Sequence, residues 1–598
     1  MELLMSADPG FEYRRRLEQR KMSAAGLDAR HHQIGNMRLI VFVSAAITAW
    51  LAFKSDQISP WWLFIPLVAY TVLVAWHGRI IQRLQQCTRA ADFYARGIAR
   101  LDEKWEGTGE PGDRFKEPDH PYAEDLDLFG KGSLFELLCG ARTHAGEQML
   151  ADWLKAPAGA GQIRHRQDAV KELSPDLDLR EDLAVLGTEV RAGVHPNPLI
   201  RWGEAPPRFR SNSVRILAAI ITCLVVLSIG VWIATGYHQW FLLGILIELL
   251  FVFLHRHTIG PVVLGAESAG RDLALLSSIL ARLESESFET PHLRMLRARL
   301  DYAGTPPSRL ISRLNRLIVL LDSRKNPFFV PIALILLWET QLAFLVEDWR
   351  RKHGHSISGW LSSVAELEAL SSLAGYSYEH PCDPFPDISE EGRCFEGKGL
   401  GHPLVPEDRC IRNDVFLTED TWVFVISGSN MSGKSTLLRT VGINAVLALA
   451  GAPVRAHQLR IAPLAVGASI RVVDSLHSGT SRFYAEITRL RKLVAISDGS
   501  IPLLFLLDEL LHGTNSHDRR IGAEAVIQGL VRRGSIGLLT THDLALAHIA
   551  DVLAPHSMNA HFEDHIEDGR MVFDYHLLPG VVKKSNALEL MRSIGLEV

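Results

Sequence analysis

The sequence predicts a multidomain protein in which transmembrane helical hairpins and an all-α core and lever region precede an α/β domain with a phosphate-binding loop (P-loop) of the ABC type. Three observations predict this fold class. Four long apolar runs lie in the first half of the chain, helical patterns dominate residues 133–155 and 261–375, and strand–loop–helix alternation follows residue 401. The 598 residues are too many for one core, and about two to four domains are expected.

Net charge and cysteine content limit the partners and the compartment. The net charge is −5, so contact with a nucleic acid would need a local basic patch rather than a global positive field. The six cysteines form no C-x-x-C pair. We therefore expect reduced thiols in the cytosol rather than disulfides or a zinc site.

The apolar runs form two pairs, each with a short break, which is the pattern of helical hairpins. They are Leu39–Phe53 with Gln57–Trp76, and Ile216–Thr235 with Trp240–Leu254. A bilayer core requires about 20 apolar residues per helix, so the second and third runs are long enough and the other two are short. Glu248 is costly in lipid and is expected to face protein. The alternative is a pair of buried core hairpins in a soluble protein.

Basic residues flank the outer ends of both hairpins, whereas the turns between the runs carry almost none. Arg38 and Arg79 flank the first pair, and Arg215 and Arg256 flank the second. Basic flanks stay on the cytoplasmic side of a membrane. We therefore expect a multi-pass protein of the inner or plasma membrane, with its soluble domains in the cytoplasm.

A fifth apolar stretch, Phe328–Val346, is predicted to be a buried helix of the soluble core. It contains Pro331, Glu339 and Gln341, and polar residues of this kind are unfavourable in a lipid-facing helix. A fifth crossing would also place the loop described below on the outer side of the membrane, away from ATP.

Changes of composition give the domain boundaries. A loop rich in Gly, Pro and charge covers 107–119, and prolines and glycines cluster again in 378–401. The predicted segments are a basic cytoplasmic N-terminal tail (1–36), a first transmembrane hairpin (37–77), a helical stalk and linker (78–121), the first part of a helical core (122–204), a second transmembrane hairpin (213–255), a helical lever and core return (261–378), and the α/β domain (395–598).

Residues 428–436 read GSNMSGKST and follow the apolar run Val423–Ile426. The pattern G-x-x-x-x-G-K-[ST] turns backbone N–H groups toward phosphate oxygens, and it brings a lysine to the β- and γ-phosphates and a hydroxyl to Mg²⁺. A strand before the loop and a helix after it disfavour a chance Gly/Ser-rich turn. The predicted nucleotide-binding residues are Gly428, Ser429, Asn430, Met431, Ser432, Gly433, Lys434, Ser435 and Thr436.

A second element of the site follows downstream, where the apolar run Leu503–Leu507 ends in Asp508-Glu509. An aspartate at the end of a buried strand can complete the coordination of Mg²⁺, so Ser435 and Asp508 are the predicted metal ligands. The next carboxylate, Glu509, can orient or deprotonate the attacking water. Alone, such a strand end is a weak signal, but it becomes specific in a chain that also has the loop.

Two further segments join this set. The apolar run Ile536–Leu539 precedes His542, which could sense the γ-phosphate; the alternative is a helix-capping Thr-His pair. Residues 474–486 read DSLHSGTSRFYAE, whose small residues could cradle a second phosphate before a helix that starts near Arg482. Alone, this segment would be a capped helix start. The predicted catalytic residues are Glu509, Lys434 and His542, with ATP and Mg²⁺ as cofactors, which makes the α/β domain a P-loop ATPase.

Together these motifs resemble the ATPase domain of the MutS family of DNA mismatch-repair proteins. GSNMSGKST, DSLHSGTSRFYAE, LLDELLHGTNSHD and TTHD carry the resemblance, and the family commonly has Asn-Met at the positions of Asn430-Met431. Gly401–Leu404 resembles the beginning of that domain, 127–157 and 364–381 resemble parts of the family's helical core, and 573–596 resembles its C-terminal dimerisation segment. The resemblance covers roughly two thirds of the chain.

The resemblance implies a DNA-binding homodimer, here anchored in the membrane, in which Ser478, Gly479 and Ser481 act in the partner subunit's ATP site. It also implies an adenine platform near Cys410–Asn413, where relatives tend to have an aromatic residue and this chain has Cys410. The Phe-x-Glu element of mismatch readers is replaced by a hairpin and stalk in residues 1–120. The alternative function is a membrane-tethered mechanical or scaffolding ATPase that acts on a protein partner without mismatch recognition.

Overall fold

The computed structural model describes residues 8–54, 58–209, 213–300, 304–390, 392–429, 431–471, 482–511, 515–567 and 570–582. The chain divides into two compact units, each made of segments that are distant in sequence. Unit 1 comprises Met1–Gly140, Ala151–Val185 and Ser371–Val598, and unit 2 comprises Ala141–Leu150 and Leu186–Leu370.

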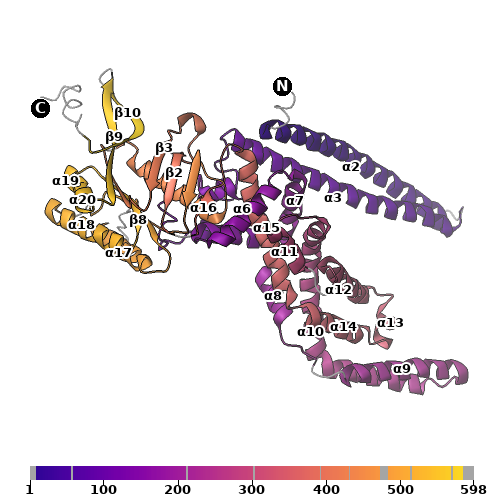
Figure 1. Cartoon of the computed structure of the whole chain (residues 1–598). Coiled ribbons are helices and arrows are strands. Elements are labelled where there is room, and N and C mark those ends of the chain that lie inside the picture. The colour runs from indigo at the N-terminus through magenta and orange to yellow at the C-terminus, as the bar shows by residue number, and fades with distance from the viewer. Residues whose placement is uncertain are drawn as a thin grey trace. The chain divides into compact units, whose positions relative to one another are not determined.

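A helical arm forms the N-terminal part of unit 1. Helices α2 (Pro9–Phe53) and α3 (Phe64–Leu101) run side by side, with the 3-10 helix η1 (Pro60–Leu63) between them in sequence (Figure 1). The predicted basic tail and the first apolar run are thus one helix, which begins where the Asp8 carboxylate accepts a hydrogen bond from the N–H of Gly10. The second apolar run and the predicted stalk are likewise one helix.

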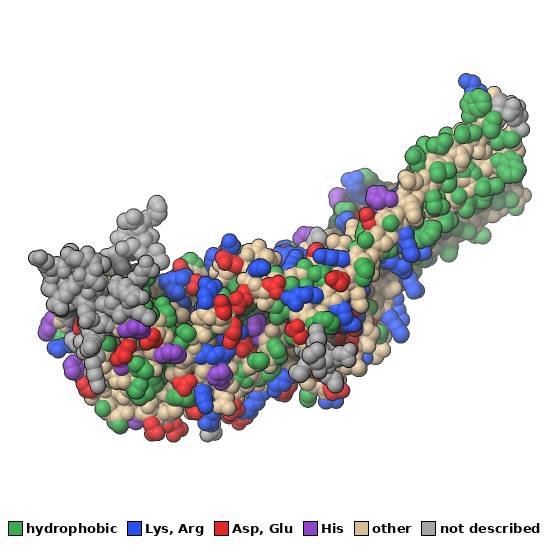
Figure 2. Space-filling model, turned by 90° about the horizontal axis from the view of Figure 1, so that it is seen from above, with side chains coloured by type: hydrophobic (Ala, Val, Ile, Leu, Met, Phe, Trp, Pro, Cys, Tyr) green, Lys and Arg blue, Asp and Glu red, His purple; other side chains and the backbone are tan. Residues whose placement is uncertain are grey.

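The part of this arm near its loop is covered with hydrophobic side chains (Figure 2). Trp61 is 85% exposed and Ile40 is 67% exposed, and contiguous exposed apolar side chains of this kind mark an interaction surface. By length and composition, four helices in the described part of the chain could cross a membrane: α2, the η1–α3 segment, α9 (Ser213–Thr235) and α10 (Gln239–Ser285). These are the helices that contain the four predicted runs.

A buried cluster holds the open end of the arm to the rest of unit 1. Tyr13 is 1% exposed, and its hydroxyl donates a hydrogen bond of 3.1 Å to Glu379 at the end of α15 (Ser356–Glu379). The Arg100 guanidinium donates to the same carboxylate over 2.6 Å. A Cβ at Gly97 would lie 2.4 Å from the Tyr13 ring, so only glycine fits at this position of α3.

Short helices complete the helical part of the chain that the sequence predicted around residues 133–155. They are η2 (Asp113–Phe115), α4 (Leu134–Leu138), α5 (His144–Lys155), α6 (Ala160–Leu173), α7 (Leu177–Gly193) and α8 (Pro196–Glu204).

Unit 2 is built around the 47-residue helix α10, which continues from the second apolar pair into the predicted lever. Glu248 is 0% exposed and therefore faces protein, as predicted. Helices α12 and α14 pack on α10. The elements after α10 are α11 (Pro291–Leu300), α12 (Pro307–Asp322), η3 (Ser323–Lys325), α13 (Val330–Ile335) and α14 (Trp338–His353).

The prediction of one buried helix over Phe328–Val346 is wrong. The chain forms two helices here, because Leu337 adopts a left-handed φ of 42° and interrupts the ladder between α13 and α14. Much of α14 is buried, but Phe328 is 91% exposed and Ile332 is 49% exposed. The prediction of burial thus holds for much of α14 but not for the first part of the segment, which this chain leaves exposed.

Two sheets form the α/β part of unit 1. The strand order of the smaller sheet is β1-β5-β2-β3, and that of the larger sheet is β10-β9-β4-β8-β7-β6. Neighbours in the larger sheet are parallel except β9 and β10. The strands are β1 (Asp387–Ile388), β2 (Phe395–Leu400), β3 (Asn413–Leu417), β4 (Val423–Ser427), β5 (Gln458–Ile461), β6 (Ala465–Ser469), β7 (Leu503–Asp508), β8 (Ile536–Thr541), β9 (Ser557–Glu567) and β10 (Arg570–Pro579).

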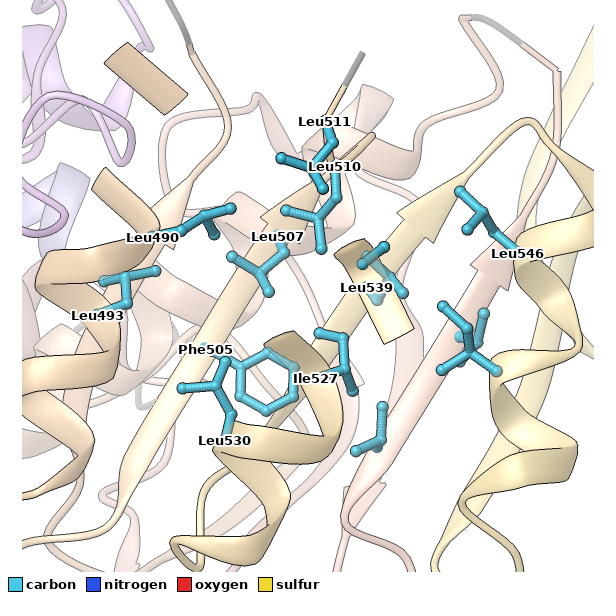
Figure 3. Packing of buried hydrophobic residues seen from close by; sticks show 14 of the residues in the cluster. Leu490, Leu493, Phe505, Leu507, Leu510, Leu511, Ile527, Leu530, Leu539 and Leu546 are labelled. Atoms are coloured by element: carbon cyan, nitrogen blue, oxygen red, sulfur yellow. The ribbon is translucent and has the colours of Figure 1, made fainter. Parts of the chain in front are cut away.

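Helices cover the larger sheet and bury its strands. Phe505 of β7 lies in one apolar cluster with Leu493 of α17 and Ile527 of α18 (Figure 3). Because parallel strands are buried on both faces, their side chains are apolar up to the carboxyl ends, where the polar residues begin. The remaining elements are η4 (Glu407–Arg409), α16 (Lys434–Ala450), α17 (Arg482–Ser497), α18 (Ser516–Arg532), α19 (Leu544–Ala547) and α20 (Ile549–Val552).

Candidate functional site

The glycine-rich loop joins the buried strand β4 to the start of α16, as predicted. Gly433 precedes the helix with a φ of 101°, and Met431 has a φ of 70°. A Cβ at Gly433 would lie 3.0 Å from the Tyr575 ring. Backbone conformation and close approach therefore both require glycine at this position.

The side chain of Lys434 lies inside this loop and is 5% exposed. Its ammonium group donates to the carbonyl oxygens of Gly428 at 2.9 Å and Ser429 at 2.7 Å. Burial lowers the pKa of Lys434, and the nearby carboxylates of Glu509 and Asp508 oppose this effect. The arrangement keeps a charged donor inside the loop at the positive end of a helix.

Ser435 and Asp508, the two predicted metal ligands, are in contact. The Ser435 hydroxyl donates to Asp508 Oδ2 over 2.5 Å. Thr540, which is the register partner of Asp508 on the adjacent strand β8, donates its hydroxyl to the other carboxylate oxygen. Carboxylate and hydroxyl oxygens are hard ligands of the kind that Mg²⁺ prefers, so this pair fits that ion. Thr540 was not predicted from the sequence.

Glu509 lies between the other two predicted catalytic residues. Its Oε1 is 3.0 Å from His542 Nδ1 and 3.8 Å from Lys434 Nζ. Glu509 has a left-handed φ of 47°, and its N–H donates to the carbonyl of Thr540 at 3.2 Å. A non-glycine residue held in this conformation next to a strand end is typical of functional sites. Strands β4, β8 and β7 are neighbours, so the three residues meet at one sheet edge.

Two buried hydroxyls of the loop are suited to bind an anion. Ser429 Oγ and Ser432 Oγ are inaccessible to solvent, and neither has a hydrogen-bond partner among the residues that the structure describes. Buried polar atoms normally have partners. Phosphate oxygens would provide them here, so the donor set of the loop fits a nucleotide phosphate chain.

A pocket of about 330 Å³ adjoins the loop and contains the predicted adenine platform. Cys410 and Asn413 line it together with Thr436 of α16 and Tyr575 of β10. The Asn413 amide donates to the Tyr575 carbonyl at 2.9 Å and accepts from the N–H of Leu577 at 2.7 Å. The pocket therefore contains an aromatic side chain, which comes from β10 and not from position 410.

Sequence reasoning missed Tyr575 because its position depends on an irregularity of the β9–β10 ladder. The pairing register shifts between Phe573 and Leu577, and Tyr575 has a φ of 56°. Such a bulge redirects a side chain from the regular alternation of a strand. His402 lines the same pocket, and burial lowers its pKa to about 4, which keeps it neutral at pH 7.

Several predicted residues lie outside the described part of the chain. They are Asn430 of the loop and Ser478, Gly479 and Ser481 of the predicted trans segment. A helix does begin at Arg482, as expected. Of the predicted dimerisation segment 573–596, only the part up to Val582 is described, and it includes most of β10, which pairs with β9 of the same chain.

These features define the class: a mostly parallel α/β domain in which a glycine-rich loop joins a buried strand to a helix and polar residues gather at the carboxyl ends of adjacent strands. Residues 424–597 match the family model of MutS domain V. This part of the chain is therefore similar to domain V of the MutS family.

Several curated proteins are similar to part of the chain. The DNA mismatch repair protein MutS 2 of Halobacterium salinarum is 35% identical over 243 residues, which are 39% of this chain and 27% of that protein. Endonuclease MutS2 of Thermus thermophilus is 32% identical over 213 residues, covering 34% and 27%. DNA mismatch repair protein MutS of Thermus caldophilus is 29% identical over 279 residues, covering 46% and 33%. The chain thus spans about a third or less of these relatives.

Proposed function

We propose that the chain is a Mg²⁺-dependent ATPase that hydrolyses ATP to ADP and phosphate at the 428–436 loop. The observation that carries the proposal is the contact of Ser435 with Asp508 beside the buried Lys434 and the strained Glu509. A hydroxyl and a carboxylate in contact at a P-loop are poised to share a divalent ion. The same residues without a nucleotide would leave two buried serine hydroxyls without partners.

Each residue of the site has a distinct role in this proposal. The loop N–H groups and the hydroxyls of Ser429 and Ser432 bind phosphate oxygens, and Lys434 exchanges its two carbonyl partners for the β- and γ-phosphates. Ser435 and Asp508 hold the Mg²⁺, which would neutralise charge on the phosphates. Glu509 accepts a proton from the attacking water.

His542 is placed to assist Glu509, since its Nδ1 lies 3.0 Å from the carboxylate. A hydrogen bond from the imidazole fixes the orientation of the carboxylate, and a protonated ring would complement the charge of a γ-phosphate. Both roles require the His542 side chain to remain at the end of β8, where the neighbouring strands β4 and β7 carry the rest of the site.

Two single substitutions test the assignment. Lys434→Ala should weaken ATP binding, because the only ammonium group among the described residues at the loop is lost. Glu509→Gln should bind ATP and hydrolyse it at least about 100-fold more slowly, as expected for loss of a general base. Nucleotide affinity and steady-state phosphate release separate the two effects. Wild-type turnover by Glu509→Gln would show that another group activates the water.

We also propose that the two hairpins anchor the protein in the inner or plasma membrane, with the remaining, soluble parts of both units in the cytoplasm. The support is the length and composition of α2, the η1–α3 segment, α9 and α10, together with exposed apolar side chains and basic flanks. Impermeant thiol reagents added from outside should label cysteines introduced near Ser59 and Gly236, at the two hairpin loops, but not near Gly107. Labelling at Gly107 would contradict this topology.

DNA is the proposed substrate by relationship, because the relatives are named as DNA mismatch repair proteins and an endonuclease. The rival function, a mechanical ATPase that acts on a protein partner at the membrane, is favoured by the four membrane-length helices. Duplex DNA binding that weakens steeply with salt would support the first, since phosphate contacts release counterions. ATP hydrolysis without measurable DNA binding would support the second.

A homodimer is the proposed assembly, in which the 474–486 segment completes the partner's ATP site. The described groups of the site lie at one sheet edge, and we infer that they would contact the phosphates from one side only. Mixing Lys434→Ala subunits with Ser478→Arg subunits should restore part of the ATPase activity, because one composite site then keeps both wild-type elements. If mixed dimers form and stay inactive, the segment does not act in trans.

A further inference from the structure

An exposed apolar segment lies between α12 and α14 of unit 2, in the region predicted to be a buried helix. Phe328 is 91% exposed, Val330 50% and Ile332 49%. These side chains are close together in sequence, and the described contacts of this chain leave them uncovered. In a protein entirely surrounded by water, such a cluster would mark an interaction site.

The position of this segment indicates what covers it. Helix α13 contacts both α9 and α10, the two helices of the second hairpin (Figure 1). Leu337, just after α13, is 2% exposed and packs in one cluster with Ala218 and Ile221 of α9 and Phe251 of α10. These hairpin residues all belong to the apolar runs that are predicted to cross the bilayer.

The depth of the contact follows from helix geometry. Ile221 is five residues after Ile216, where the apolar run of α9 begins, and Phe251 is three residues before Leu254, where the run of α10 ends. With a rise of about 1.5 Å per residue, Leu337 packs roughly 4–8 Å inside the apolar runs. Interfacial helices bury their apolar face to a depth of about 5–10 Å at the boundary of headgroups and acyl chains.

A basic residue, Arg256, borders the same region. Arg256 follows the apolar run of α10, its guanidinium lies 4.4 Å from the centre of the Phe253 ring, and no ion pair of Arg256 occurs among the described residues. Arg256 also lines a pocket of about 350 Å³ between α10 and α13, whose other walls include Val252, Ile259 and Leu334. Arg324 and Glu339 also line the pocket, but they form an ion pair with each other, so Arg256 is the cation available to a lipid phosphate. A cation beside an apolar wall suits a phospholipid, whose phosphate would meet Arg256 and whose acyl chains would meet the wall.

We propose that residues 327–336 form an interfacial membrane segment. The segment enters the leaflet next to the soluble part of unit 2 and lies against the base of the second hairpin. Phe328, Val330 and Ile332 contact acyl chains, and Arg256 contacts lipid phosphate. This inference rests on the proposed membrane anchoring, and it adds a contact site that the four crossings do not require. The segment would fix the depth at which unit 2 stands on the bilayer.

The test places an environment-sensitive fluorescent amino acid at position 328 or 332 of the full-length protein. The protein is reconstituted into phosphatidylcholine–phosphatidylglycerol vesicles that contain phospholipids with a nitroxide at a shallow or a deep acyl position. Leu227, 65% exposed near the middle of α9, is the reference for the bilayer core. Ala298, exposed on α11 of the same unit, is the reference for water.

We expect quenching at 328 and 332 to be several-fold stronger than at 298, and stronger with the shallow nitroxide than with the deep one. Position 227 should show the opposite depth preference. Quenching at 227 without quenching at 328 and 332 would overturn the interfacial segment and leave the anchoring intact; a second protein copy or another partner would then cover these residues. Absence of quenching at 227 as well would overturn the membrane anchoring itself.

Discussion

Tyr575 offers a sharp test of how the site recognises its nucleotide, because sequence motifs did not reveal it. Its ring lies against Gly433 of the phosphate-binding loop and lines the pocket that Cys410 and Asn413 share. If ATP binds with its phosphates at the loop, the base enters this pocket. Tyr575→Ala should then weaken ATP binding by removing a stacking surface and should leave the phosphate contacts in place.

The magnitude follows from stacking energies and from the exposure of the ring. Removal of an aromatic side chain that stacks on a base costs about 1–3 kcal/mol. Tyr575 is 42% exposed, so we take the lower part of that range, about 1–2 kcal/mol. At 1.4 kcal/mol per factor of ten, this corresponds to a Kd for ATP that is about 5- to 30-fold higher.

Isothermal titration of the purified protein with ATP and, separately, with inorganic tripolyphosphate measures the effect. Tyr575→Ala should lose affinity for ATP and keep the wild-type affinity for tripolyphosphate, which has no base. Tyr575→Phe is the matched control, since it retains the ring and should bind ATP within about twofold of wild type. Equal losses for both ligands would mean that the substitution disturbs the loop, and unchanged ATP affinity would mean that the base lies elsewhere.

Two further substitutions test the arm and the pocket. Gly97→Ala forces a methyl group against the Tyr13 ring, 2.4 Å away, and should cost about 1–3 kcal/mol and speed amide hydrogen exchange in α2; Gly26→Ala, with open space around it, should not. Burial lowers the pKa of His402 to about 4, so as the pH falls the unfolded chain takes up a proton before the folded chain does. The free energy of unfolding should therefore decrease by up to about 3 kcal/mol as the pH decreases from 6.5 to 4. His402→Asn, which keeps an acceptor for the N–H of Leu404, should flatten this part of the pH profile of thermal unfolding; an unchanged profile would show that His402 does not titrate in this way.

The parts of the site that could be predicted are those fixed by local sequence. The run Val423–Ile426, the glycine spacing and Lys434 specify a strand, a turn and a helix start without reference to the rest of the chain. Asp508-Glu509 could be placed because a buried parallel strand reads as an apolar run, and its carboxyl end is where the polar residues begin. The structure brings these residues together at neighbouring strands, as expected.

The parts that could not be predicted depend on which strand or helix lies alongside. Thr540 is a partner of Asp508 only because β8 is adjacent to β7 in this register. Tyr575 reaches the loop only because the β9–β10 ladder shifts. The apolar composition around Phe328 indicates that contact with water is unfavourable, but it does not indicate whether a protein core or lipid would replace the water.

The same limitation of sequence-based prediction affects the predicted domain boundaries within the arm. Composition divides residues 1–121 into a tail, a hairpin and a stalk, because the side chains change from polar to apolar and back. The backbone hydrogen bonds of a helix do not depend on that change, so α2 and α3 continue through the predicted boundaries. The helices that carry the apolar runs therefore extend without a break to Tyr13 and Arg100, which are bonded to Glu379. A change of composition along the sequence is thus not a boundary of secondary structure here, and the membrane-length part of the arm is continuous with the buried cluster of unit 1.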